Sequence, residues 1–277
     1  MILITGANGQ LGTELRNLLD ERSIDYVATD SSELDITDAD AVEKAFAEVK
    51  PTIVYHCAAY TAVDKAEDEG KEVDYLVNVV GTENIAKESA RYKSTLVYIS
   101  TDYVFNGDKP TDQEWFEEDE TDPQTEYGRT KLLGEEAVRK YVPNHYIIRT
   151  SWVFGKYGNN FVFTMQKLAK THDTLTVVDD QFGRPTWTRT LAEFMTYLVD
   201  NRKEFGTYHL SNDGVTNWYG FAKEILKDSD VSITPVDSSQ FVQKAKRPKN
   251  SIMSLAKTKA TGFIVPTWQD ALNEMMK

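Results

Sequence analysis

The stretch that decides the fold reads Ile2-Leu3-Ile4-Thr5-Gly6-Ala7-Asn8-Gly9-Gln10-Leu11-Gly12. Its first four residues indicate a strand, and leucines at helical spacing over Leu11–Asp20 indicate a helix directly after it. A strand, a glycine-rich turn and a helix place a phosphate at the helix N-terminus, where free N–H groups and the helix dipole meet it. Gly6 would allow the tight turn, Gly9 the approach of a pyrophosphate, and Gly12 the packing of helix on strand. The spacing is G-x-x-G-x-x-G, and its position predicts dinucleotide binding.

A second motif, Tyr127-Gly128-Arg129-Thr130-Lys131, places a tyrosine and a lysine four residues apart in a helical pattern. Such side chains are neighbours on one helix face. A nearby ammonium stabilises the phenolate, and lowering the tyrosine pKa by about three units takes roughly 4 kcal/mol. We expect Lys131 and a positive nicotinamide ring to supply this together. An isolated motif of this kind is more often a surface pair, but the glycine turn favours the catalytic interpretation.

A third motif, Ser100-Thr101-Asp102-Tyr103-Val104-Phe105, follows the apolar run Leu96–Ile99, which indicates a buried strand. Ligands of doubly wound sheets lie beyond the carboxyl ends of the strands. The hydroxyls of Ser100 and Thr101 are therefore expected to point at the cofactor crevice. The alternative is an ordinary strand-ending turn capped by polar side chains.

The composition is typical of a soluble enzyme. The chain has 277 residues, 40% of them hydrophobic, which suits one large or two modest domains. Its 31 basic and 44 acidic residues give a net charge of −13, which argues against nucleic-acid binding. An anionic substrate would therefore need local arginines or helix N-termini.

We expect a cytoplasmic location and no membrane attachment. No apolar run approaches membrane-spanning length, and Met1 leads directly into the first strand, without a signal peptide. Cys57 is the only cysteine, so no internal disulfide can form, and we interpret it as a small buried hydrophobe.

Strand and helix patterns alternate along the first half of the chain. The expected strands are 2–5, 26–29, 52–59, 96–100 and 146–150, and the expected helices are 11–20, 39–49, 73–92 and 126–141. The alternation predicts an α/β fold: a Rossmann-type doubly wound parallel sheet with a smaller C-terminal α/β substrate-binding domain. We place the cofactor domain at 1–153 and the substrate domain mainly at 154–277, with segments near 175–190 returning to the Rossmann sheet. The acidic segment 106–123 is expected to be an exposed loop at the rim of the site.

Taken together, the motifs resemble the extended short-chain dehydrogenase/reductases and, within them, the dTDP-4-dehydrorhamnose reductases. The resemblance covers essentially the whole chain. Its most specific parts are Ala58-Ala59-Tyr60-Thr61-Ala62-Val63-Asp64-Lys65-Ala66-Glu67 and Asp180-Gln181-Phe182-Gly183-Arg184-Pro185-Thr186. Weaker matches are Arg149–Val153, Gly158–Phe161 and Arg247–Ser251.

The resemblance implies an NAD(P)H-dependent oxidoreductase that reduces the C4 ketone of dTDP-4-dehydro-6-deoxy-L-mannose to dTDP-L-rhamnose. Tyr127 would be the proton donor, Lys131 would bind the nicotinamide ribose and lower the Tyr127 pKa, and Thr101 would orient the carbonyl. With the glycine turn included, the expected cofactor residues are Gly6, Gly9, Gln10, Leu11, Gly12, Asp30, Asp35, Ile36, Ala58, Ala59, Tyr60, Tyr127 and Lys131. The expected substrate residues are Asp102, Tyr103, Trp152, Arg184 and Arg247, with a core position as the alternative for Trp152.

The choice between NADPH and NADH stays open. Asp30 ends the second strand, where an acidic residue accepts the ribose 2′-OH of NADH, and the sequence shows no adjacent arginine for a 2′-phosphate. The family nevertheless often accepts NADPH. Asn78 either supports Lys131 through water or bonds only to backbone.

Some relatives dimerise through a metal held by clustered carboxylates. Glu14 matches one ligand position, but Trp187-Thr188-Arg189 stands where acidic neighbours are expected. We therefore expect no metal site, and a monomer or weak homodimer. Two other functions stay open: a nucleotide-sugar epimerase or dehydratase, and a non-catalytic subunit like the regulatory subunit of methionine adenosyltransferase. Dehydratases place an Asp-Glu pair after the catalytic threonine, whereas Tyr103 follows Asp102 here.

Overall fold

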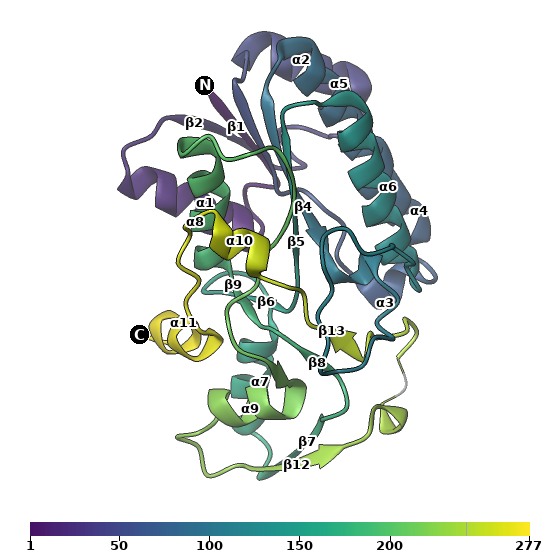
Figure 1. The fold of residues 1–277 in the computed structure, drawn as a ribbon, viewed down its shortest axis with the longest axis vertical. Coiled ribbons are helices and arrows are strands. Elements are labelled where there is room, and N and C mark those ends of the chain that lie inside the picture. The colour runs from purple at the N-terminus through teal and green to yellow at the C-terminus, as the bar shows by residue number, and fades with distance from the viewer. Residues whose placement is uncertain (242) are drawn as a thin grey trace.

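The computed structural model describes residues 1–241 and 243–277. Six parallel strands form the main sheet in the order β10-β5-β4-β3-β1-β2 (Figure 1). They are β1 (Ile2–Thr5), β2 (Tyr26–Thr29), β3 (Ile53–His56), β4 (Thr95–Thr101), β5 (His145–Thr150) and β10 (Gly206–His209). The five strands expected from the sequence all lie in this sheet, although β3 is shorter than expected. The strand order reverses between β1 and β3, which is where doubly wound sheets bind nucleotides.

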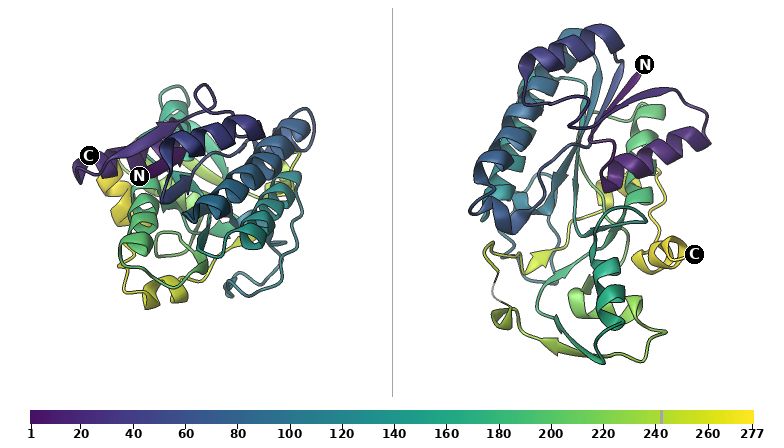
Figure 2. Two further views of the ribbon diagram at one scale, coloured as in Figure 1. Left: turned by 90° about the horizontal axis from the view of Figure 1, so that it is seen from above. Right: turned by 180° about the vertical axis from the view of Figure 1, so that it is seen from behind.

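Helices cover both faces of the sheet, as Figures 1 and 2 show. One face carries α2 (Ala39–Val49), α5 (Thr82–Tyr92) and α6 (Glu126–Tyr141), and the other carries α1 (Gln10–Glu21) and α8 (Thr188–Asp200). The predicted doubly wound fold is therefore confirmed. The expected helix 73–92 is interrupted, because α4 (Lys71–Tyr75) continues into a π-helix, η1 (Leu76–Gly81), before α5 begins. Such π-turns occur frequently at functional sites.

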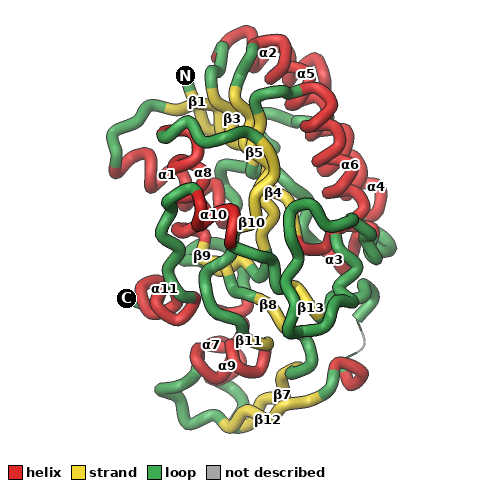
Figure 3. The backbone as a smooth tube through the Cα atoms, viewed as in Figure 1, coloured by secondary structure: helices red, strands yellow, loops and turns green. Residues whose placement is uncertain are grey.

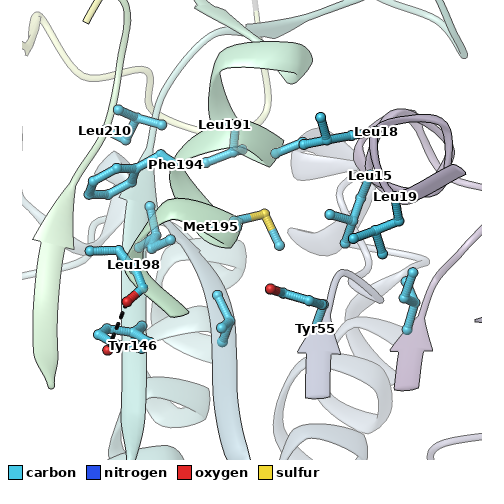
Figure 4. Packing of buried hydrophobic residues seen from close by; sticks show 14 of the residues in the cluster. Leu15, Leu18, Leu19, Tyr55, Tyr146, Leu191, Phe194, Met195, Leu198 and Leu210 are labelled. Carbon is cyan, nitrogen blue, oxygen red and sulfur yellow. Dashed lines mark hydrogen bonds between the residues drawn. The ribbon is translucent and has the colours of Figure 1, made fainter. Parts of the chain in front are cut away.

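The packing of α1 against α8 closes the core on its face of the sheet (Figure 4). Leu15 and Leu19 of α1 and Phe194 of α8 are fully buried or nearly so. The Tyr146 hydroxyl on β5 donates to the Leu198 carbonyl over 3.2 Å, which ties α8 to the sheet. Each buried side chain of this size contributes about 1.5–3 kcal/mol.

A smaller lobe carries the remaining short strands (Figure 3). Its strand pairs are β7 (Thr174–Val178) with β12 (Ser232–Val236), β8 (Phe182–Gly183) with both β11 (Thr216–Asn217) and β13 (Asn250–Ser251), and β6 (Val153–Phe154) with β9 (Thr186–Trp187). Its helices are α7 (Phe161–Ala169), α9 (Trp218–Ile225) and α11 (Trp268–Met275), whereas α10 (Ala256–Ala260) lies against β10 of the main sheet, where the Thr258 hydroxyl donates to the His209 carbonyl at 2.6 Å. The short elements α3 (Val63–Ala66), η2 (Asp102–Val104) and η3 (Ser238–Gln240) complete the described chain.

The chain returns to the main sheet later than the sequence suggests. We expected segments near 175–190 to rejoin it, but β7, β8 and β9 pair with strands of the smaller lobe. The chain returns to the main sheet through α8, which packs on one face of it, and through β10, which pairs in parallel with the edge of β5. In the described part of the chain, no helix is both long and apolar enough to cross a membrane.

Candidate active site

A cavity of about 940 Å³ lies at the carboxyl ends of the strands and is lined by residues of both lobes. Its lining contains many of the side chains that the sequence predicts. Of the residues predicted to bind the cofactor, the following line the cavity: Gly9, Gln10, Leu11, Gly12, Ala59, Tyr127 and Lys131. From the catalytic and substrate sets it takes Thr101, Asp102, Tyr103, Trp152 and Arg247. Residues from all three predicted sets thus share one cavity.

The glycine turn fits a pyrophosphate. Gly6 has φ +66°, and a Cβ there would lie 2.5 Å from the Ala58 nitrogen. A Cβ at Gly12 would lie 2.2 Å from the Gly6 carbonyl oxygen, so the helix can approach the turn only with glycine here. Within the described residues, no side chain caps α1, whose N-cap is Gly9. Its first N–H groups therefore stay available to an anion.

The catalytic set comes from two elements. Thr101 ends β4, while Tyr127 and Lys131 lie on α6, whose first turn is capped by the Thr125 hydroxyl accepting from the Gly128 nitrogen at 3.0 Å. A Cβ at Gly128 would lie 2.2 Å from the Tyr103 carbonyl oxygen, so this glycine lets α6 pack closely against η2. A side chain at position 128, directly after Tyr127, would therefore disturb the packing of α6 on η2.

Burial dominates the electrostatics of the catalytic set. It raises the pKa of Tyr127, while a hydrogen bond with the Thr101 hydroxyl lowers it. In the cofactor-free site the pKa of Tyr127 is thus above its usual value, and the expectation that Lys131 and the nicotinamide ring lower it together stays a prediction. Burial also lowers the pKa of Lys131 to about 7, although the carboxylates of Glu135 and Asp74 oppose this. A lysine desolvated to this extent is a weaker stabiliser of a phenolate.

A buried ion pair supports α6 behind the cavity. The Glu135 carboxylate accepts from Arg149 Nε at 2.9 Å and Nη2 at 2.8 Å, and from the Ser100 hydroxyl at 2.5 Å. Ser100 lines the cavity as expected, yet its hydroxyl is used in this network. Despite burial, which raises it, hydrogen bonds from Arg149 hold the pKa of Glu135 below its usual value. The network fixes the helix turn that follows Lys131.

Asn78 fixes a loop that the sequence places along the cofactor. Its Oδ1 accepts from the Tyr60 nitrogen at 2.9 Å, and its Nδ2 donates to the Tyr60 carbonyl at 3.1 Å. The same Nδ2 donates to Asp74 Oδ1 at 2.7 Å, and Asp74 Oδ2 accepts from the Thr130 hydroxyl at 2.8 Å. Asn78 therefore bonds to the Tyr60 backbone, but not only to backbone as the alternative had it, because the Asp74 side chain is a further partner. The π-helix that carries it thereby connects the Tyr60 loop to α6.

Acidic and aromatic side chains gather on the substrate side. Asp102 accepts hydrogen bonds from the Ser251 and Thr101 hydroxyls, and burial raises its pKa to about 6. Trp152 is half-buried and lines the cavity, which contradicts a core position. It adopts φ 49°, unusual for a bulky residue, and stacks on Trp218 with ring centroids 3.8 Å apart. A Cβ at Gly183 would lie 2.9 Å from Trp152 Cε2, so glycine makes room for this indole.

Some predicted residues lie outside the described lining of the cavity: Gly6, Asp30, Asp35, Ile36, Ala58, Tyr60 and Arg184. The prediction fails most clearly for Arg184, whose side chain is buried. It pairs with Glu114 Oε1 at 2.6 Å and donates to the Met253 carbonyl. Its guanidinium thus holds the 106–123 loop against the β13 region rather than facing the cavity, so the geometry gives no support to a substrate contact.

The sequence also misses residues that the structure brings to the cavity. Phe161, Trp218, Phe241 and Gln243 line it, all from the smaller lobe. Phe161 and Trp218 have a local signal, because each directly follows an asparagine that caps a helix: Asn160 accepts from the Phe163 nitrogen at 3.2 Å, and Asn217 accepts from the Gly220 nitrogen at 2.7 Å. Their convergence depends on tertiary packing that no local pattern encodes.

Arg189 occupies the position where acidic residues were expected beside Glu14. It pairs with Glu14 at 3.7 Å, Glu21 at 2.5 Å and Glu193 at 2.9 Å. Within the described residues, no group of three or more His, Cys, Asp or Glu side chains could hold a metal ion. The carboxylates at this position thus pair with a guanidinium.

Comparison with known proteins agrees with this geometry. The family model described as RmlD substrate binding domain matches residues 1–277. The spore coat polysaccharide biosynthesis protein SpsK of Bacillus subtilis is 42% identical over 100% of this chain and 96% of its own length. A dTDP-4-dehydrorhamnose reductase crystal structure from Clostridium acetobutylicum has a TM-score of 0.95 and 44% identity, covering 99% of this chain and 98% of that chain.

A second crystal structure, a dTDP-4-dehydrorhamnose reductase from Bacillus anthracis in complex with NADP, also has a TM-score of 0.95. It is 40% identical and covers 99% of this chain and 98% of that chain. The likeness therefore extends over both lobes. The resemblance that the motifs indicate is confirmed, and the chain belongs to the dTDP-4-dehydrorhamnose reductase family that the RmlD substrate binding domain defines.

Proposed function

We propose that this protein is an NAD(P)H-dependent oxidoreductase that reduces the C4 ketone of dTDP-4-dehydro-6-deoxy-L-mannose to dTDP-L-rhamnose. The single observation that carries the proposal is the convergence of Thr101, Tyr127 and Lys131 on the cavity that also contains the glycine turn. The NADP complex of the Bacillus anthracis relative and the names of the reductase relatives support the cofactor and the substrate.

The cofactor, when bound at the glycine turn, supplies the hydride. Tyr127 donates its hydroxyl proton to the developing alkoxide at O4 of the sugar. A raised pKa suits this function, because Tyr127 keeps its proton until a stronger base than phenolate forms beside it. The Thr101 hydroxyl, a hydrogen-bond partner of Tyr127, orients the carbonyl oxygen and stabilises its growing charge.

Lys131 has a binding function in this mechanism. We propose that it holds the ribose hydroxyls next to the nicotinamide, and such contacts would return polar partners to an ammonium that burial otherwise disfavours. Its charge then assists Tyr127 only in the loaded site. The expected lowering of the Tyr127 pKa therefore stays a prediction for the loaded enzyme.

The other side of the cavity suits a nucleotide sugar. Arg247 provides a guanidinium for a diphosphate, and Trp152 and Trp218 provide flat apolar surfaces for the sugar and base. Asp102 and Tyr103 lie between these groups and the catalytic set. This arrangement supports a nucleotide-sugar substrate, in which a diphosphate joins a sugar to a nucleoside.

The test is an assay of the purified chain with dTDP-4-dehydro-6-deoxy-L-mannose and NADPH or NADH. We expect stoichiometric cofactor oxidation and formation of dTDP-L-rhamnose, identified by mass spectrometry and by its L-rhamno configuration in NMR spectra. An epimerase would change the sugar without net cofactor oxidation, and a non-catalytic subunit would do neither. Either result, in protein that binds the cofactor, would contradict the proposal.

A further inference from the structure

An arginine lies beside the glycine turn, close to the carboxylate of Asp30. Arg16 Nη1, from α1, donates to Asn8 Oδ1 at 3.0 Å and to the Ala7 carbonyl at 3.4 Å. The Asn8 nitrogen in turn donates to Asp30 Oδ2 at 3.1 Å. Asn8 therefore joins a guanidinium on one side to a carboxylate on the other. The sequence hides this relationship, because no arginine is adjacent to Asp30 along the chain.

The hydrogen-bond partners of the Arg16 guanidinium in the described chain are neutral oxygens. Across residues 1–241 and 243–277, Arg16 takes part in no ion pair, and its Nε is buried without a hydrogen-bond partner. In contrast, Arg149, Arg184 and Arg247 each pair with a carboxylate. In a chain of net charge −13, a guanidinium held only by amide and carbonyl oxygens is a favourable place for an anion.

The position of this guanidinium defines which anion it suits. In doubly wound folds the adenosine ribose lies at the end of the second strand, where a carboxylate accepts the 2′-OH of NADH or an arginine holds the 2′-phosphate of NADPH. Here Asp30 directly follows β2, and Arg16 shares Asn8 with it. We propose that Arg16 is the specificity-determining residue that admits the 2′-phosphate of NADPH at a site where Asp30 alone would select NADH.

The proposal rests on the proposed use of NAD(P)H. It makes the preference between NADPH and NADH depend on the opposing charges of Asp30 and Arg16. The Asp30 carboxylate repels a 2′-phosphate and attracts a 2′-hydroxyl, whereas Arg16 attracts the phosphate. A phosphate oxygen is a stronger acceptor for Nη1 than the neutral amide oxygen of Asn8. Nη1 is therefore expected to exchange the Asn8 oxygen for a phosphate oxygen when NADPH binds.

The test measures binding of two small nucleotides that carry no nicotinamide, so it does not depend on sugar reduction. Calorimetry with 2′,5′-ADP and with 5′-AMP isolates the effect of the 2′-phosphate. We expect Arg16→Ala to weaken 2′,5′-ADP about tenfold or more and to change 5′-AMP binding by less than about twofold. Arg16→Lys should keep part of the 2′,5′-ADP affinity, because it keeps the charge but loses the planar fork.

Lys44→Ala, an exposed lysine on α2, is the matched control for the loss of one positive charge. It should leave both affinities unchanged. Arg16→Gln repeats the test should Arg16→Ala fail to fold, which circular dichroism will show. The proposal would be overturned if the Arg16 variants bound both nucleotides equally more weakly, or if neither affinity changed. Equal binding of both nucleotides by the unaltered chain would also overturn it. Failure of the reductase assay alongside a selective loss of 2′,5′-ADP would contradict only the proposed reaction.

Discussion

Arg247 donates a hydrogen bond to the Tyr103 hydroxyl across 3.2 Å, and both residues line the cavity. The same guanidinium pairs with Asp64, which lies in one of the two most specific runs of the family resemblance. Arg247 belongs to the segment before β13, whereas its two partners belong to the larger lobe. The contact thus joins the lobes beside the catalytic set, and it leaves a guanidinium where an anionic substrate would lie.

Arg247→Ala should raise KM for the sugar nucleotide, because the diphosphate loses a charge-assisted partner. We expect an increase of roughly tenfold or more with little change in cofactor affinity. Arg202→Ala, at an exposed position, is the matched control. Equal and small effects of the two substitutions would show that the diphosphate is held elsewhere, by backbone N–H groups for example.

Tyr127→Phe should lower kcat by about 10²–10⁴-fold, because it removes only the proton donor. Folding and cofactor affinity should persist. Tyr75→Phe, at a tyrosine that is 42% exposed, should leave turnover unchanged. Near-normal turnover of Tyr127→Phe, measured by cofactor oxidation under saturating substrate, would contradict the assignment.

Lys131→Met should lower activity and weaken NAD(P)H binding together, since one ammonium serves both functions in the proposed mechanism. Fluorescence titration of the reduced cofactor measures the affinity independently of turnover. An unchanged affinity would contradict the ribose contact and leave Lys131 only an electrostatic effect on Tyr127.

The same variant should change how stability depends on pH. Burial lowers the pKa of Lys131 to about 7 in the folded chain, against about 10.4 for an unfolded lysine. Between these values the unfolded chain binds more protons, so this lysine makes the folded state gain stability as pH rises. Lys131→Met removes that slope. Its stability relative to the unaltered protein should be greatest at and below pH 7 and should decrease towards pH 10.

Urea unfolding of the cofactor-free protein at several pH values measures this difference. Lys44→Met, at an exposed position on α2, is the control and should show no such trend. A stability difference that does not vary with pH would mean that Lys131 keeps a normal pKa in the folded chain.

Asp30→Ala should raise the kcat/KM for NADPH relative to NADH, because the carboxylate penalises a 2′-phosphate. The Asp30 carboxylate also accepts from the Ser31 nitrogen at 2.7 Å, so a modest loss of stability is expected as well. An unchanged ratio of the two kcat/KM values would place the ribose away from Asp30.

Local patterns were sufficient to predict the larger lobe. Strands β1 and β2 and helices α2 and α6 begin and end where the sequence predicts, because apolar periodicity and caps such as Asp38 mark their limits. The structural functions of Gly6 and Gly12 were also predictable, because the backbone comes so close at both positions that a side chain cannot fit. Thr101, Tyr127 and Lys131 line one cavity, and their catalytic functions stay predictions.

Relationships across the chain were beyond local patterns. The pairing of β10 with β5 and the position of Trp218 in the cavity depend on packing between segments that are distant in the sequence. The segments near 175–190 were expected in the main sheet, but the sheet that β7 joins is decided by its partner β12, which lies more than 50 residues further along the chain. A cytoplasmic location, a monomeric or weakly dimeric state and the domain division at residue 153 stay predictions.

The late return of the chain to the main sheet has a consequence for dissecting the protein. A fragment that stops at residue 153 would lack β10, and β5 would then present an open edge with unpaired amides. It would also lack α8, which leaves Leu15, Leu18 and Leu19 of α1 facing solvent. We therefore expect that a fragment of residues 1–153 does not fold on its own.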